Sequence, residues 1–432
     1  MNKKVNVIGA GLAGCEAAWQ IAGLGIEVNL YEMKPKKFSP AHKSSNLCEL
    51  VCSNSFKAYR LESASGLLKE EMRVLNSLIL SCADNCRVPA GGALAVDREK
   101  FSKLVTEKIK GNEFINLISN EVNKIDLNEI TIVATGPLTS EILSEEIKNI
   151  CGGYLSFFDA AAPIVTAESI NMDKAFFASR YGRGNPEDYL NCPLSKEEYE
   201  IFYNELVNAE RAKLHDIDKV NVYEGCMPVE IMAARGFDTL RYGPMKPVGL
   251  KNPKSEEKPF AVVQLRKETV SGELYNMVGF QTNLKFQEQK RVFGLIPALE
   301  NLEIVRYGVM HRNTFINSPK LLNCDYSMRS IPNLFFAGQI TGVEGYIESA
   351  SSGLIAGKSA AMKILQNKSF ELPKSTMMGA LAGYISDESV KNFQPMGANF
   401  GIIDSLEEKI RDKKERYKKI SEKSIEILKG LK

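Results

Sequence analysis

The first 32 residues combine two apolar runs with a helical pattern between them. The run from Val5 to Ile8 is typical of a strand that is buried on both faces in a parallel sheet. Small apolar residues follow at helical spacing, and a second apolar run from Val28 to Tyr31 ends at Glu32. This succession predicts strand, helix and strand, the first unit of a doubly wound α/β domain.

Three glycines lie in the predicted turn between the first strand and the helix and at the start of that helix. Gly9, Gly11 and Gly14 form GxGxxG, which allows a tight turn, close approach of a pyrophosphate and close packing of helix on sheet. An acid at the end of the second strand can bind a ribose hydroxyl. An S-adenosylmethionine methyltransferase usually has an acid just before the glycines, where this chain has Val7 and Ile8. The segment therefore predicts a dinucleotide site made by Gly9, Ala10, Gly11, Leu12, Ala13, Gly14 and Glu32.

Later segments favour FAD over NAD as the dinucleotide. Residues 88–109 end in a helical pattern, and residues 131–137 form a buried strand that runs into a glycine turn. Residues 333–361 give a late strand that ends in Ala337-Gly338, followed by a small-residue helix. Many flavoproteins return to the first dinucleotide fold in this way and cover the flavin. This late segment adds five predicted cofactor-binding residues: Gly338, Gln339, Gly342, Gly345 and Tyr346.

Between these halves the pattern changes to an amphipathic helix within 196–214 and to alternating strands that favour antiparallel pairing. We therefore predict an α/β protein with a split, Rossmann-like FAD-binding domain and an inserted α+β domain. The predicted boundaries are 1–175, 176–305 and 306–432. The last 28 residues form a basic helical segment, for which a solvated face is favoured over an RNA-gripping one.

Composition narrows the functional class. A net charge of +2 over 432 residues excludes a global basic field, so any RNA contact depends on local patches. We expect neither a signal peptide nor a membrane-spanning segment. Nine cysteines without a paired framework indicate a reducing cytoplasm.

Two cysteines lie in surroundings that suit an exposed thiolate. Cys52 lies in ELVCSNS, and Cys226 follows a glycine in EGCMPVE. The other cysteines are interpreted as small buried hydrophobes, and zinc is rejected because Cys82 and Cys86 have neither CxxC spacing nor a histidine partner. The absence of CxxC also disfavours a disulfide reductase. His42 and His311 are interpreted as polar contacts, and three Arg-rich segments as candidates to hold phosphates or a folate tail: 179–184, 235–250 and 305–313.

These motifs resemble those of a known family. The blocks GAGLAG, SPAHK, ELVCSNS, VPAGGALAVDR, EGCMPVE, FFAGQITGVEGYIESA and FQPMGANFG occur in the same order as in TrmFO, once called Gid. That family comprises folate- and FAD-dependent RNA uracil-5-methyltransferases, and the resemblance extends from residue 4 to the 410s. The related GidA or MnmG family shares the FAD fold but is much longer, with an extra C-terminal domain.

The resemblance implies a mechanism and a set of cofactors. FAD, 5,10-methylenetetrahydrofolate and NAD(P)H are the implied cofactors, and the one-carbon unit passes from the folate to the reduced flavin. Cys226 is implied as the nucleophile that adds to C6 of uracil, which makes C5 nucleophilic. Cys52 is implied as the partner that shields the flavin intermediate or takes the C5 proton, before a flavin hydride completes the methyl group.

Two departures from the family pattern leave the RNA substrate open. The family usually has His and Trp where this chain has Asn283 and Phe286, and a small residue where it has Cys48. Cys48 and Cys52 are spaced to meet on a helical turn, where Cys48 would be a resolving thiol. Most of the family methylates the T-loop uridine of tRNA, whereas a mycoplasma-type branch, RlmFO, acts on 23S rRNA.

Two other functions remain open from the sequence. A flavoprotein oxidoreductase on a small molecule would turn over with NAD(P)H and need neither folate nor Cys226. An RNA-binding protein with FAD but without catalysis would bind RNA equally well after Cys226→Ala. The sequence does not define the oligomeric state.

Overall fold

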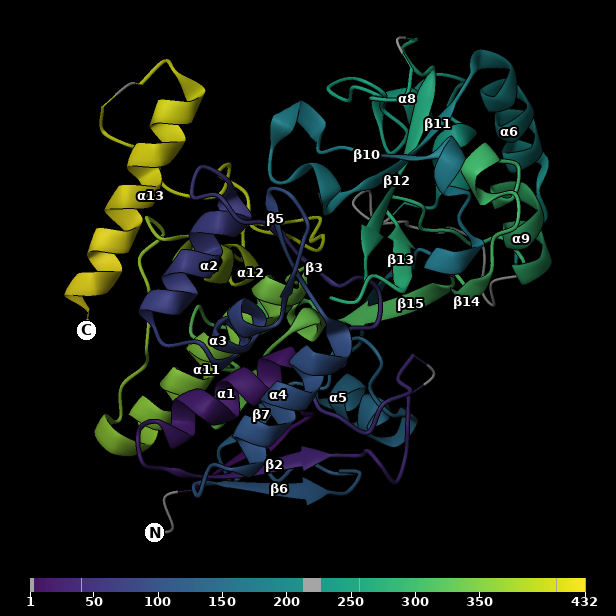
Figure 1. The fold of residues 1–432 in the computed structure, drawn as a ribbon. Coiled ribbons are helices and arrows are strands. Elements are labelled where there is room, and N and C mark those ends of the chain that lie inside the picture. Colours follow the sequence, from purple (N-terminus) through teal and green to yellow (C-terminus); the bar gives the residue numbers. More distant parts are fainter. Residues whose placement is uncertain (1–3, 40, 213–226, 256, 409, 432) are drawn as a thin grey trace.

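The computed structural model describes residues 4–39, 41–212, 227–255, 257–408 and 410–431. The chain is organised around two sheets, with the N-terminal and C-terminal segments sharing the first and the middle of the chain forming the second (Figure 1).

The first sheet has five parallel strands in the order β16-β7-β1-β2-β6. The central strand β1 lies between β2 and β7, and β16 from the late part of the chain pairs with β7 at the edge, so the sheet is complete only when β16 returns. The strands are β1 Lys4–Ile8, β2 Glu27–Glu32, β6 Ile115–Ser119, β7 Thr131–Val133 and β16 Leu334–Phe336. The α/β class and the split parallel sheet predicted from the sequence are confirmed.

Two helices packed against each other form the centre of this domain. α1 and α11 approach so closely that a Cβ on Gly353 of α11 would lie 2.1 Å from the backbone oxygen of Ala13 in α1. Only glycine permits that spacing. The helices of this domain are α1 Leu12–Ala22, α2 Ala64–Val74, α3 Leu78–Asn85, α4 Arg98–Lys110, α5 Glu141–Cys151, α10 Ser318–Leu321, α11 Tyr346–Gln366, α12 Met377–Ile385 and α13 Lys413–Gly430.

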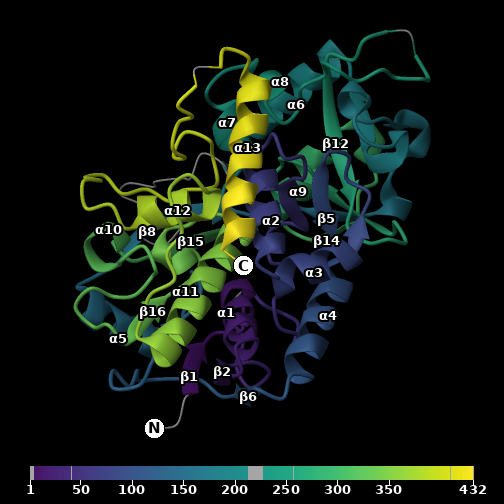
Figure 2. The same cartoon turned by 90° about the vertical axis from the view of Figure 1, so that its left-hand side faces the viewer.

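The C-terminal helix α13 lies along α2 on the outside of the molecule (Figures 1 and 2). Its buried side includes Ile420, Ser421, Ser424 and Leu428. Ser424 Oγ donates to the buried carboxylate of Glu71 in α2 at 2.5 Å. The same carboxylate accepts from Met377 N and Met378 N at the start of α12. The sequence indicated the buried side of this helix mainly by its apolar residues, and hydrogen bonds from polar residues on the same side also hold the helix in place.

The second sheet is formed by the middle of the chain, in the order β10-β11-β12-β13-β9-β14, with every pair antiparallel. It includes β9, which precedes the predicted boundary at residue 176. β12 is mostly buried rather than alternating: Ala261, Val263 and Leu265 belong to the core of this domain, and Val262 and Arg266 on the other face are buried as well. The strands are β9 Ile164–Thr166, β10 Phe176–Phe177, β11 Leu190–Leu194, β12 Ala261–Lys267, β13 Leu274–Met277 and β14 Ile304–Arg306. Its helices are α6 Lys196–Asn208, α7 Val229–Ala233, α8 Thr239–Tyr242 and α9 Phe286–Phe293.

Two small sheets connect the halves. The chain leaves the first domain along β8 and returns along β15, and these strands pair antiparallel with each other. Beside them, a three-stranded sheet in the order β3-β5-β4 supports the segment that carries Cys52. The bounds are β3 Ser55–Ala58, β4 Arg87–Val88, β5 Ala93–Val96, β8 Leu155–Ala160 and β15 Met310–Phe315.

Candidate functional site

A large cavity opens at the carboxyl ends of the parallel strands β1, β2 and β7. Its wall includes the turn after β1, the end of β2 and the turn after β7, and the space between these walls, which is open to solvent, is about 1180 Å³. In doubly wound sheets, ligands bind outside the carboxyl ends of the strands, so the cavity lies where a dinucleotide is expected.

The turn between β1 and α1 has the backbone geometry that its glycines allow. Gly9 adopts φ +100°, and a Cβ there would lie 2.6 Å from the backbone oxygen of Ala134. A Cβ on Gly14 would lie 1.7 Å from the backbone oxygen of Gly9. At Gly11, by contrast, a Cβ would meet no atom within 4 Å. Gly9 and Gly14 are thus required by the fold, whereas Gly11 leaves space that faces the cavity.

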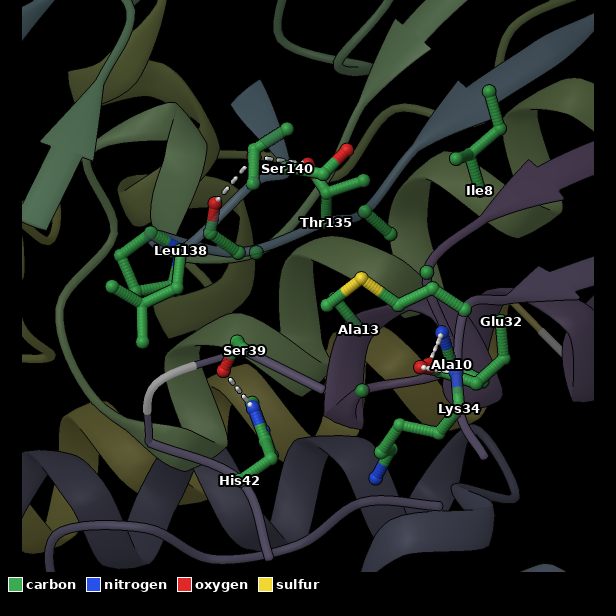
Figure 3. Close-up of a pocket in the computed structure, with 18 of the residues that line it drawn as sticks. Ile8, Ala10, Ala13, Glu32, Lys34, Ser39, His42, Thr135, Leu138 and Ser140 are labelled. Carbon is green, nitrogen blue, oxygen red and sulfur yellow. Dashed lines mark hydrogen bonds between the residues drawn. The ribbon is translucent and has the colours of Figure 1, made fainter. Parts of the chain in front are cut away.

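Glu32 joins the end of β2 to the glycine turn. One oxygen of its carboxylate accepts from Ala10 N at 3.0 Å and the other from Lys34 N at 3.0 Å (Figure 3). Each carboxylate oxygen can accept a second hydrogen bond, so the side chain can still bind a hydroxyl. Gly9, Ala10, Gly11, Leu12, Ala13 and Glu32 all line the cavity.

The late segment reaches the same cavity through Gly338, Gln339 and Tyr346. Gly338 N donates to Ser352 Oγ of α11 at 2.7 Å, which ties the turn to the helix. Gly342 and Gly345 do not line the cavity, and both have positive φ. A Cβ on Gly342 would lie 2.4 Å from the Phe393 ring, so this glycine shapes the turn.

Part of the wall comes from residues that the sequence did not predict to bind the cofactor. They lie at 39, within 42–51, and at 120–122 and 135–143, and Ser39, His42, Thr135 and Ser140 are drawn in Figure 3. His42 Nδ1 lies 2.6 Å from Ser39 Oγ, and burial together with Lys34 lowers the pKa of this imidazole. The sequence could have predicted residues 120–122 as part of the wall, because they follow β6 directly and loops at the carboxyl ends of parallel strands meet at one edge of the sheet.

Cys52 lies beside the cavity and contacts Tyr346, which is 294 residues away in the chain. The Tyr346 hydroxyl lies 3.0 Å from Cys52 Sγ and accepts from Cys52 N at 2.9 Å and from Ser53 N at 3.3 Å. Tyr346 is the first residue of α11 and also lines the cavity. The structure thus brings one predicted cysteine to the end of the cavity that the late segment forms.

Polar contacts between the two domains hold the segment of Cys52. Arg98 of α4 binds the buried carboxylate of Glu268 at 2.6 and 3.2 Å and donates to Leu50 O at 2.8 Å. Arg266 of β12 donates to Asn54 Oδ1 at 3.0 and 2.7 Å. Asn54 in turn donates to Val96 O and Lys267 O, both at 3.1 Å. Both domains therefore fix the position of Cys52.

The other cysteines are placed differently. Cys226 lies outside the described residues. Burial raises the pKa of Cys48 well above its ordinary value, and that of Cys192 to about 12. The prediction that Cys48 and Cys52 meet on a helical turn is wrong, because the chain between them is irregular. The Cys48 thiol instead points to Ala10 O at 4.0 Å and to Cys15.

The Arg-rich segments divide into internal and exposed side chains. Arg180 donates to Lys246 O at 2.7 Å, Val248 O at 2.6 Å and Gln264 Oε1 at 3.1 Å, so its role is structural. These bonds support an exposed pair next to it, in which the Arg183 guanidinium lies 5.7 Å from the centre of the Tyr181 ring. Tyr181 is 53% exposed, and its backbone adopts φ +59°.

The other Arg-rich segments, and the two residues that stand where the family usually has His and Trp, make mostly local contacts. Arg241 donates to Phe260 O at 3.0 Å, and Arg306 is half-buried. The side chains of His311 and Arg312 lie outside the described part. Asn283 is buried, with its backbone nitrogen bound to Glu230 and its side chain to Ala212 O. Phe286 is exposed and stacks on Tyr307 at 4.5 Å.

Among the described residues, no cluster of three or more His, Cys, Asp or Glu side chains is placed to hold a metal ion. No helix in the same residues is long and apolar enough to cross a membrane.

The cavity fits a dinucleotide cofactor. The open space at Gly11 lies at the N-terminus of an 11-residue helix, where unsatisfied backbone N–H groups attract a pyrophosphate. Glu32 offers a carboxylate that can accept from a ribose hydroxyl, and Tyr346 adds an aromatic ring to the wall. The assignment of these residues to FAD binding stays a prediction.

Comparison with known proteins gives the family. Residues 4–368 match the family model described as glucose inhibited division protein A. This chain is 64% identical to a protein from Acetivibrio thermocellus and 59% identical to one from Natranaerobius thermophilus. Both relatives are named methylenetetrahydrofolate–tRNA-(uracil-5-)-methyltransferase TrmFO. In each case the alignment covers 98% of this chain and 98% of the relative.

Solved structures show the same fold. GidA from Aquifex aeolicus superposes with a TM-score of 0.72 at 15% identity, over 99% of this chain and 73% of that one. A second crystal form of GidA gives a TM-score of 0.70. The chain therefore belongs to the GidA family and, within it, to the TrmFO group.

Proposed function

We propose that this protein methylates C5 of a uracil in tRNA, with methylenetetrahydrofolate as carbon donor and reduced FAD as reductant, in the cytoplasm. The observation that carries the proposal is a dinucleotide cavity with a cysteine at its edge, in a chain 64% identical over nearly its full length to a protein named for this activity. NAD(P)H is proposed as the reductant that returns the flavin to its reduced state.

The residues of the cavity would hold FAD in a defined direction. The N-terminus of α1 would hold the pyrophosphate and Glu32 a ribose hydroxyl, and Tyr346, with Cys52 beside it, would border the flavin. Bound FAD, once reduced, supplies the hydride that completes the methyl group. The folate would lie at the same end, since the one-carbon unit must reach the flavin.

Two cysteines are proposed to act on the uracil. C5 of a neutral uracil is a poor nucleophile, and addition of a thiolate to C6 gives it enolate character. We assign this addition to Cys226, which lies outside the described residues, and the removal of the C5 proton to Cys52. Cys52 suits that role because its loop is fixed from both domains.

The RNA must bring an unstacked base to this edge of the cavity. Tyr181 and Arg183 support an RNA partner, because exposed aromatic and guanidinium planes stack on splayed bases. Their loop is anchored near the site: Tyr189 donates to Ala90 O at 3.0 Å, and Asp188 accepts from Gly91 N at 2.8 Å. We propose tRNA because the relatives are named for tRNA.

The test supplies the holoenzyme with NAD(P)H, labelled methylenetetrahydrofolate and either unmodified tRNA or unmodified 23S rRNA. We expect labelled 5-methyluridine in tRNA alone, and none with Cys52→Ala or Cys226→Ala. Label in rRNA alone would replace tRNA as the substrate. Flavin turnover with NAD(P)H and no label in either RNA would reject methylation in favour of an oxidoreductase.

A further inference from the structure

The hydrogen bonds of Tyr346 determine which atom donates to Cys52. A phenol oxygen can accept two hydrogen bonds and donate one. The Tyr346 oxygen already accepts from Cys52 N at 2.9 Å and Ser53 N at 3.3 Å. The remaining neighbour is Cys52 Sγ at 3.0 Å, so the phenol proton points at the sulfur. The sulfur is therefore the acceptor in this contact.

The charges around this contact favour an anion. Burial, and after it the charge of Arg98 in α4, lower the pKa of Arg266 in β12 and of Arg306 in β14, so the three guanidinium groups lie near one another. The acidic groups that face them are the carboxylates of Glu268, which binds Arg98 directly, and Glu49, and the phenols of Tyr189 and Tyr346. Three guanidinium groups thus meet two carboxylates.

The cysteine lies within this group of charges. Cys52 and Tyr346 both lie close enough to Arg98 for a negative charge on either to raise the pKa of that guanidinium, after the larger effect of Glu268. Burial raises the pKa of Tyr346 well above its ordinary value, so the phenol keeps its proton and Cys52 is the group of the two that can carry the charge. Arg98 is also fixed by Leu50 O, two residues before Cys52. A negative charge on Cys52 would balance the excess positive charge at the junction.

We propose that Tyr346 is a positioning residue whose hydroxyl donates to Cys52 Sγ and, together with the arginines, keeps Cys52 as a thiolate in the resting enzyme. Thiolates are stabilised by hydrogen-bond donors and by nearby cations. Tyr346 therefore has two roles: its ring forms part of the cofactor cavity, and its hydroxyl controls the neighbouring cysteine.

The thiol proton of Cys52 passes to solvent before the reaction, and Tyr346 retains its own proton throughout. If the proposed function is correct, the thiolate accepts the proton from C5 of the uracil and becomes a thiol, which then returns the proton to solvent. Only this last role depends on the proposed function.

The test measures alkylation of Cys52 in the holoenzyme by iodoacetamide as a function of pH, with the Cys52 peptide quantified by mass spectrometry. For Tyr346→Phe we expect alkylation near neutral pH to slow by about tenfold or more, since hydrogen bonds to charged groups are among the strong ones. The rate should recover at higher pH. Tyr154→Phe, which loses a hydroxyl bound to Ser144 O, serves as the matched control and should match wild type.

A measurement on wild type keeps the proposal testable if Tyr346→Phe folds poorly. The ultraviolet thiolate absorbance of wild type minus that of Cys52→Ser should be present at neutral pH and vanish on acidification. An unchanged pH profile in Tyr346→Phe, or no thiolate difference at neutral pH, would overturn the proposal. Neither readout needs RNA or folate, so its failure is distinguishable from failure of the methylation proposal.

Discussion

Gly11 and Gly14 offer a matched pair of substitutions, because the same added methyl group has opposite effects on the fold. At Gly11 a Cβ meets no atom within 4 Å, and the residue is extended with φ −78°, which alanine adopts freely. At Gly14 a Cβ lies 1.7 Å from the Gly9 oxygen. A normal contact is about 3.4 Å, so roughly 1.7 Å of movement would be needed, and overpacking of that kind costs about 1–3 kcal/mol or more.

Gly11→Ala should therefore fold like wild type, with a free energy of unfolding within about 0.5 kcal/mol when both are measured without cofactor. Its methyl group would occupy the space through which the pyrophosphate approaches. If the clash with the ligand costs about 1–3 kcal/mol, FAD binds roughly 5- to 150-fold more weakly. Gly14→Ala should lose both stability and FAD.

The assay combines urea unfolding of the apoprotein with titration of FAD by flavin fluorescence. The reasoning on the dinucleotide site is refuted if Gly11→Ala binds FAD as tightly as wild type. It is also refuted if Gly11→Ala loses stability to the same extent as Gly14→Ala, because the effect on FAD would then follow from a damaged fold.

Three further predictions concern stability and RNA binding. Burial raises the pKa of Glu71 to about 7, from about 4.5 when the carboxyl is exposed. The folded state therefore binds the proton more tightly than the unfolded state. The free energy of unfolding should fall by up to about 3 kcal/mol as pH rises from about 4.5 to 7. Glu71→Gln should remove that slope in urea titrations, and an identical slope in both proteins would contradict the assignment. Glu268→Gln should destabilise the fold by about 3 kcal/mol in urea unfolding, because Arg98 would keep its charge in a buried site without its carboxylate, and a loss below about 1 kcal/mol would count against a buried pair. Tyr181→Ala should weaken tRNA binding in filter assays by roughly 5- to 150-fold at unchanged FAD content, which is what the loss of about one stacked base would cost. Tyr59, which is also exposed, is the control, and Tyr59→Ala should not weaken tRNA binding. Equal effects of the two substitutions would argue against a stacking surface at Tyr181.

The parts of the fold that the sequence predicted are those set by local pattern. The strand, glycine turn and helix of residues 4–22 are observed, as are Glu32 at the end of β2 and the late strand before α11. Each depends on apolar periodicity or on a glycine with a strict steric role, and both are visible within about 30 residues of chain.

The contacts that complete the site depend on tertiary structure. Tyr346 and Cys52 are 294 residues apart, and Arg98 and Glu268 are 170 apart. No local pattern predicts such pairs, because they form only after both domains have folded. The expected helical turn at Cys48 failed for the same reason: spacing of four suggests a helix, but the segment is held as a loop by distant partners such as Thr106, which accepts from Leu47 N.

The central claim is that the carbon comes from the folate and the hydride from the flavin of this protein. A single-turnover experiment tests both: holoenzyme with prereduced FAD is mixed without oxygen or NAD(P)H with labelled methylenetetrahydrofolate and unmodified tRNA. We predict that the flavin is oxidised and that about one labelled 5-methyluridine forms in tRNA for each flavin oxidised. Flavin oxidation without labelled 5-methyluridine, or label without flavin oxidation, would contradict the claim.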